Sequence, residues 1–89
     1  MREARQQRQA IISALYQQRR LNPSQPGITL TDLEQMLKVS KSELEFSLWY
    51  LTDGGFIKRG DNGHHSILMK GVDLAEMMMD RGLLNPAAA

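Results

Sequence analysis

The segment Val39–Ile57, VSKSELEFSLWYLTDGGFI, decides the fold that we expect for this chain. Its leucines recur at the three- and four-residue spacing of a helix that buries one face. These leucines are Leu44, Leu48 and Leu51. The pair Gly54-Gly55 predicts the end of the helix, and the β-prone pair Phe56-Ile57 predicts the start of a strand. The segment therefore predicts a helix that leads directly into a β structure.

The outward face of this predicted helix is aromatic and acidic. At about 100° per residue, its aromatic side chains fall roughly opposite the leucines. They are Phe46, Trp49 and Tyr50, with Glu43 and Glu45 beside them. Clustered exposed aromatic residues usually mark a contact surface, whereas DNA phosphates attract positive charge. We therefore predict a partner surface at Phe46 and Trp49, and we include Tyr50, whose position also suits the edge of the core.

Two predicted helices precede this segment. The first covers Arg2–Arg20, which lacks Gly and Pro, and the Pro- and Gly-containing stretch 22–27 ends it. Its buried side is predicted at Ile11, Ile12 and Leu15, and Tyr16 is predicted to turn towards the side of Arg20. A short strand at 28–30 follows. The second helix is predicted to begin after an N-cap at Thr31, with Glu34 completing a capping box.

The connection between the second and third helices is short. Only Lys38 and Val39 separate the predicted helix ends, so the two helices must meet at a steep angle, as in a helix-turn-helix. Ser40 is the predicted N-cap of the third helix, with Glu43 at the reciprocal position.

A hairpin and a last helix complete the predicted order. Two β-prone runs, 56–59 and 64–69, surround an Asn-Gly turn, which predicts a hairpin. A final helix is predicted at 71–81, with Gly82 as its C-terminal cap. We expect one domain over residues 1–84 and a disordered tail at 85–89.

The composition sets limits on function. The chain has 89 residues, enough for one core, because independent folding usually fails only below roughly 40 residues. It has no cysteine, which excludes disulfides and thiolate chemistry. No apolar run approaches the roughly 20 residues of a membrane span, and MREARQQRQA lacks the apolar core of a secretory signal. We expect a cytoplasmic protein with no membrane partner.

Positive charge is concentrated at the N-terminal end. Residues 1–20 carry five arginines against Glu3, a balance of +4, whereas residues 21–89 carry six basic and nine acidic side chains, a balance of −3. Such an asymmetry indicates either a polyanionic partner or a solubilising helix end.

The order of these motifs resembles a small winged helix-turn-helix domain of the prokaryotic regulator type, over roughly residues 8–82. The residues that carry the resemblance are Leu30-Thr31-Asp32-Leu33, Leu48 with Tyr50-Leu51, Gly55-Phe56-Ile57 and Ile67-Leu68-Met69-Lys70-Gly71-Val72-Asp73. The resemblance implies a mainly α fold with a small β-hairpin wing (α+β), in the order α-β-α-α-β-β-α. It also implies a DNA-binding transcriptional regulator that forms a homodimer.

Six residues are the DNA contacts that this resemblance implies. They are Arg19, Arg20, Lys41, Ser42, Lys58 and Arg59. The third helix of the family enters the major groove, but between Lys41 and Asp53 the charges here are one positive and three negative. The alternative is therefore a winged helix module that binds protein through Phe46, Trp49 and Tyr50 and does not bind DNA. In the last helix, Leu74 and Met77 are candidate dimer contacts.

Catalysis and metal binding are not expected. The chain lacks a phosphate-binding glycine loop, an activated nucleophile and a carboxylate pair in a plausible cleft. His64 and His65 are adjacent, so in a strand they point to opposite faces and cannot readily bind one ion. A position in a loop or at the wing tip is the prediction for both. We expect a non-enzyme without cofactor or metal.

Overall fold

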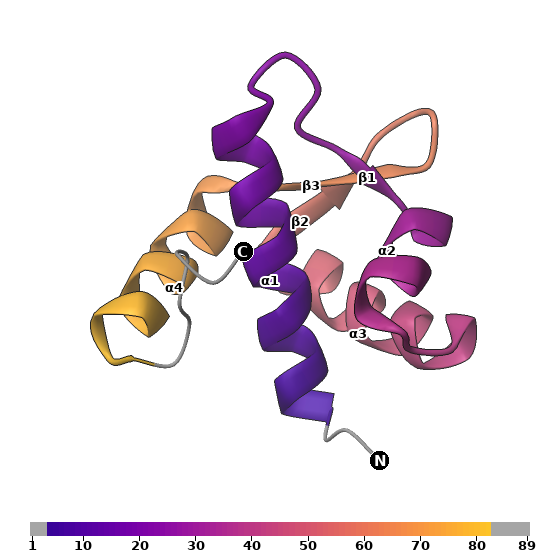
Figure 1. Ribbon diagram of the computed structural model, residues 1–89, viewed down its shortest axis with the longest axis horizontal. Coiled ribbons are helices and arrows are strands. Elements are labelled where there is room, and N and C mark those ends of the chain that lie inside the picture. The colour runs from indigo at the N-terminus through magenta and orange to yellow at the C-terminus, as the bar shows by residue number, and fades with distance from the viewer. Residues whose placement is uncertain (1–3, 83–89) are drawn as a thin grey trace.

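The computed structural model describes residues 4–82. In chain order, the elements are α1 (Ala4–Leu21), β1 (Ile28–Thr29), α2 (Leu30–Leu37), α3 (Lys41–Asp53), β2 (Ile57–Arg59), β3 (His64–Ile67) and α4 (Met69–Asp80) (Figure 1). The strands form one antiparallel sheet, with β3 between β1 and β2. This part of the chain is thus mostly helical with a small sheet, an α+β architecture. The start of the predicted first helix and the predicted tail at 85–89 lie outside the described residues.

The core forms around α1, which crosses the middle of the molecule with α4 on one side and α2 and α3 on the other (Figure 1). The predicted apolar stripes of α1 and α3 are confirmed, because their side chains are buried. They are Ile11, Ile12 and Leu15 in α1, and Leu44, Leu48 and Leu51 in α3. The hairpin and α4 add Ile57, Ile67, Ala75 and Met78 to the same cluster. None of the helices within residues 4–82 combines the length and apolarity that a membrane span requires.

Two residues of α1 are more buried than the sequence predicts. Gln7 is 4% exposed, and its Oε1 accepts a hydrogen bond of 3.3 Å from the hydroxyl of Ser47 in α3. Tyr16 lies beside Arg20 as predicted, but its ring is buried and its hydroxyl donates to Glu76 of α4 at 3.1 Å. A hydrogen bond lets each polar group enter the interior, because the partner replaces the lost water.

The second helix begins two residues earlier than predicted. Its N-cap is Thr29, whose Oγ1 accepts a hydrogen bond of 3.2 Å from the amide of Asp32. The predicted cap at Thr31 and the predicted strand over 28–30 are therefore wrong at this boundary. Both threonines suit an N-cap, but Leu30 packs partly against the core and so lies within the helix.

The third helix begins and ends as predicted. The hydroxyl of Ser40 accepts from the amide of Glu43 at 3.4 Å and donates to its carboxylate at 3.3 Å. Gly54 follows the last helical residue, and Gly55 adopts φ 81°, a left-handed conformation that glycine reaches without strain. The chain then turns directly into the hairpin.

The last helix begins at Met69, two residues before the predicted start. Gly71 is buried inside its first turn, where an added methyl group would overlap the Phe56 carbonyl oxygen and the Ile67 side chain. This close approach joins α4 to the hairpin. At the other end, Gly82 adopts φ 74° directly after the helix and its amide donates to the Met79 carbonyl at 3.0 Å, as its predicted capping role requires.

Candidate functional site

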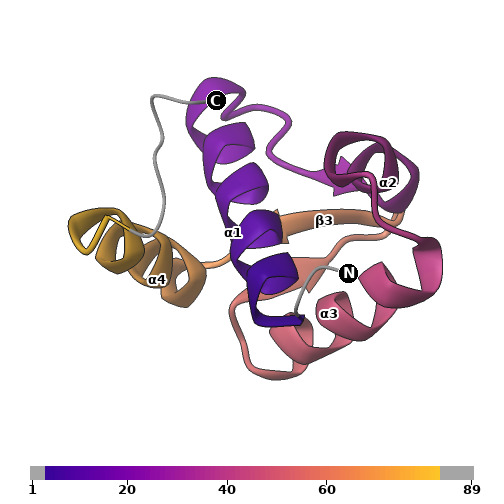
Figure 2. The same ribbon diagram turned by 60° about the horizontal axis from the view of Figure 1, so that its bottom comes forward.

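The outer face of α3 carries two exposed aromatic side chains. Phe46 and Trp49 are 56% and 59% exposed, and they lie one helical turn apart. Their ring centroids are 5.8 Å apart at an interplanar angle of 40°. The helix α3 lies at one edge of the described fold, so one of its sides has no helix or strand beyond it (Figure 2). The aromatic pair predicted from the sequence is therefore at the surface.

Tyr50 belongs to a different surface. Its ring is 45% exposed, but the guanidinium of Arg8 lies over it, 4.0 Å from the ring centroid. Tyr50 also lines a mainly apolar hollow of about 210 Å³ with Leu74 and Met78. The predicted three-residue aromatic face thus divides, and Tyr50 joins the side where α1 and α4 meet α3.

The two candidate dimer contacts on α4 differ in the same way. Leu74 is partly buried against the core, at the hollow beside Tyr50. Met77 is 43% exposed. Only Met77 of this pair therefore offers an exposed apolar side chain.

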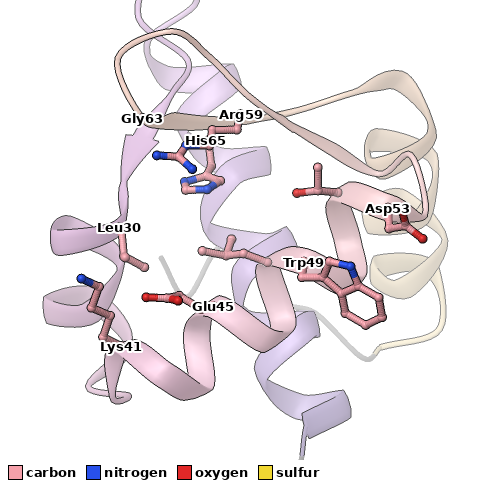
Figure 3. Close-up of a pocket in the computed structure, with 10 residues that line it drawn as sticks. Leu30, Lys41, Glu45, Trp49, Asp53, Arg59, Gly63 and His65 are labelled. Atoms are coloured by element: carbon pink, nitrogen blue, oxygen red, sulfur yellow. The ribbon is translucent and has the colours of Figure 1, made fainter.

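A cleft of about 650 Å³ separates α3 from the β2–β3 hairpin. Side chains from α2, α3 and both hairpin strands line it (Figure 3). They include Leu30, Lys41, Glu45, Trp49, Arg59 and His65. Arg59 and His65 extend from the hairpin side, and Lys41 and Glu45 extend from α3 (Figure 3). The cleft has the volume of a small-molecule site, although it is open to solvent.

His65 is buried beside this cleft. It is 7% exposed, and its Nδ1 has no hydrogen-bond partner within residues 4–82. Burial lowers the pKa of His65, and the positive charge of Arg59 lowers it further, while a hydrogen bond with the backbone of Ile28 opposes this shift. The ring is therefore neutral at pH 7.

The structure brings one basic residue of α3 and one of the hairpin to the same cleft and places Lys58 elsewhere. Lys41 and Arg59 both line the cleft. Arg59 is the cross-strand partner of His65, so it shares the cleft-facing side of the sheet, and Lys58 points to the opposite face. Ser42 is exposed, with its hydroxyl 3.4 Å from that of Ser40.

The two arginines at the end of α1 are used within the chain. Arg19 donates to the carbonyl of Pro23 at 3.0 Å. Arg20 donates to the hydroxyl of Tyr16 at 3.1 Å, and this hydrogen bond raises the arginine pKa. Neither arginine lines the cleft, so the six predicted DNA contacts do not form one surface.

His65 was missed as a site residue by the sequence analysis, which predicted a loop or wing-tip position. The structure corrects this, because His65 lies in the central strand, two residues before the buried Ile67. Strand alternation places these two side chains on one face and His64 on the other, and that alternation is the signal that identifies His65. No group of three His, Cys, Asp or Glu side chains within residues 4–82 is arranged to hold a metal ion.

Comparison of the chain with protein-family models, with curated proteins and with solved structures gives no significant match. The outer face of α3 and the cleft beside it are therefore the two candidate functional surfaces of this protein.

Proposed function

We propose that this protein is a winged helix domain that dimerises or binds a partner protein through the outer face of α3, without catalytic activity. The element order α1-β1-α2-α3-β2-β3-α4 is the order that the sequence resemblance implies, and it supports the winged helix assignment. In this assignment α2 and α3 are the helix-turn-helix, and β2 and β3 are the wing.

The exposure of Phe46 and Trp49 carries the proposal. Both rings are more than half exposed, and within residues 4–82 each has only the other as an aromatic partner. Large aromatic side chains at the centre of an interface contribute much of its binding energy. A protein that covers α3 would remove both rings from water at once.

The charge of α3 favours a protein partner over DNA. Lys41 stands against Glu43, Glu45 and Asp53, a balance of −2 for this helix. Phosphate neutralisation supplies most of the non-specific affinity for DNA, so an acidic helix disfavours groove binding. A partner with an apolar centre and a basic rim is complementary to this face.

Sedimentation velocity over a range of protein concentrations tests the proposal. We expect the wild-type protein to self-associate, and Trp49→Ala to weaken the association by about 30-fold, the effect of losing about 2 kcal/mol at an interface centre. Helix content by circular dichroism should not change, because Trp49 is exposed. The control is Met69→Ala, since Met69 is 83% exposed and belongs to another helix, α4.

Two outcomes would count against this function. Association that survives in Trp49→Ala and in Phe46→Ala would place the interface elsewhere. A monomeric wild-type protein would exclude a second copy as the partner, and its binding to duplex DNA would then favour the second candidate function.

DNA binding is the second candidate, because one observation favours it. Lys41 from α3 and Arg59 from the hairpin line the same cleft, so two cations from the two DNA-contacting elements of the family lie on one side. Fluorescence polarisation with a mixed-sequence duplex at low salt tests this candidate. Binding should weaken steeply with added salt and in the double variant Lys41→Gln/Arg59→Gln; binding that salt does not change would refute it.

A further inference from the structure

We infer that the cleft between α3 and the hairpin binds a free α-amino acid with an apolar side chain. Its zwitterionic head would lie between Arg59, His65 and Glu45, and its side chain would lie against Leu48 and Trp49. This site shares Trp49 with the protein-binding face, but its binding groups Arg59, His65 and Glu45 do not depend on the proposed function.

The first observation is the unpartnered nitrogen of His65. The residue is 7% exposed, its ring faces the cleft (Figure 3), and Nδ1 makes no hydrogen bond within residues 4–82. A buried polar atom without a partner costs about 1–3 kcal/mol, so such atoms are rare in folded proteins. A ligand group that forms a hydrogen bond with Nδ1 would remove this cost.

The state of the ring defines what kind of group can bind. Burial lowers the pKa of His65, so the ring is neutral at pH 7 and one of its nitrogens donates while the other accepts. A zwitterion carries both an ammonium donor and a carboxylate acceptor, so it can satisfy Nδ1 in either tautomer.

The charges around Nδ1 match both ends of a zwitterion. Arg59 is the cross-strand partner of His65, so its guanidinium can bind a carboxylate immediately beside the ring. Glu45 lines the cleft from α3, on the side opposite the hairpin (Figure 3), where its carboxylate can accept from an ammonium group. The cleft thus offers a cation and a carboxylate to the two charged groups of a zwitterion.

The apolar lining supplies the third element of the site. Leu30, Leu48 and Trp49 line the cleft beside the charged groups, and Trp49 is partly exposed. An aliphatic side chain placed there would cover apolar surface that is now open to water.

The test is a titration of the full chain with L-leucine, followed by calorimetry and by the fluorescence of Trp49, the only tryptophan in the chain. We expect a saturable signal. N-acetyl-L-leucine lacks the ammonium group and L-leucine amide lacks the carboxylate, so each should bind at least about tenfold more weakly, a difference of about 1.4 kcal/mol.

Two exposed neighbours in β2 give a matched pair of variants. Arg59→Gln should weaken L-leucine binding at least about tenfold, whereas Lys58→Gln, on the opposite face of the same strand, should bind like the wild type. Nitrogen NMR of His65 gives a readout without mutation, because the Nδ1 resonance should move when L-leucine binds.

Three results would overturn the inference. They are a titration with L-leucine that gives no saturable signal, equal binding of N-acetyl-L-leucine, and equal losses in Arg59→Gln and Lys58→Gln. Because Trp49 belongs to both surfaces, the titrations are made at a protein concentration at which sedimentation velocity shows the monomer, so failure of ligand binding and failure of self-association are read separately.

Discussion

The aromatic side chains of this protein divide between a closed region and an open one. Three of the five lie under a cation of the same chain. These pairs are Arg20 over Tyr16 at 5.8 Å, Arg8 over Tyr50 at 4.0 Å and Lys70 over Phe56 at 4.6 Å. Phe46 and Trp49, on the outer face of α3, have no cation over them within residues 4–82 and contact each other. Tyr16, Tyr50 and Phe56 thus make contacts within the fold, whereas Phe46 and Trp49 remain exposed to a partner.

This difference also explains the positive charge at the N-terminal end. Arg8 and Arg20 of α1 cover aromatic rings, and Arg19 binds the loop after the helix. A cation over an aromatic face contributes about 0.5–1 kcal/mol at an exposed site. These three arginines therefore have partners within the fold. Their positive charge alone does not indicate that α1 is a DNA-binding surface.

The largest effect on stability is expected at Gly71, where α4 packs directly against the hairpin. Gly71→Ala should lower the free energy of unfolding by about 1–3 kcal/mol, because its methyl group would overlap the Phe56 carbonyl and Ile67. The control is Gly60→Ala, whose added methyl group would meet only the His64 carbonyl oxygen at an ordinary 3.5 Å. Urea denaturation checks both. Equal stability of the two variants would mean that α4 is not held against the hairpin.

A smaller effect is expected at the link between α1 and α4. Tyr16→Phe removes a hydroxyl that donates to Glu76 and accepts from Arg20, and should cost about 1 kcal/mol of stability. Tyr50→Phe is the matched control, since the Tyr50 hydroxyl makes no hydrogen bond within residues 4–82. Thermal and urea unfolding measure both losses. A loss in Tyr50→Phe as large as in Tyr16→Phe would show that the hydroxyl network does not distinguish the two tyrosines.

Much of the fold could be predicted because local rules dominate it. Leucine spacing located α3, Ser40 located its start, and the Gly54-Gly55 pair located its end. The start of α2 was missed because Thr29 and Thr31 are equally good caps, and the choice depends on how Leu30 packs against distant residues. Long-range packing carries no local signal in the sequence.

The candidate site was less predictable for the same reason. Exposure of Phe46 and Trp49 follows from helical spacing alone. The separation of Tyr50 from this pair depends on Arg8, which lies on another helix. The cleft likewise forms only when the hairpin packs beside α3. Residue spacing in the sequence therefore could not predict that Arg59, His65 and Glu45 line one cleft.

The smallest effect is expected at His65, a buried residue of β3 whose titration makes the stability depend on pH. The pKa of His65 is lowered in the folded protein, chiefly by burial, whereas an unfolded chain has a His pKa of about 6.5. Between the two values the unfolded state binds more protons, so the free energy of unfolding should fall as the pH drops below about 6.5. The slope should stay under about 1.4 kcal/mol per pH unit, the value for one whole proton.

Two histidine variants separate this contribution from the rest of the chain. Urea unfolding between pH 5 and 7, a range chosen to lie above the ordinary carboxylate pKa values of about 4, should show the slope in the wild type and in His64→Gln, because His64 is exposed. In His65→Gln the slope should flatten, since the buried titrating group is gone. If His65→Gln kept the full slope, another group would be responsible, and the neutral state of the buried His65 beside the cleft would lose its support.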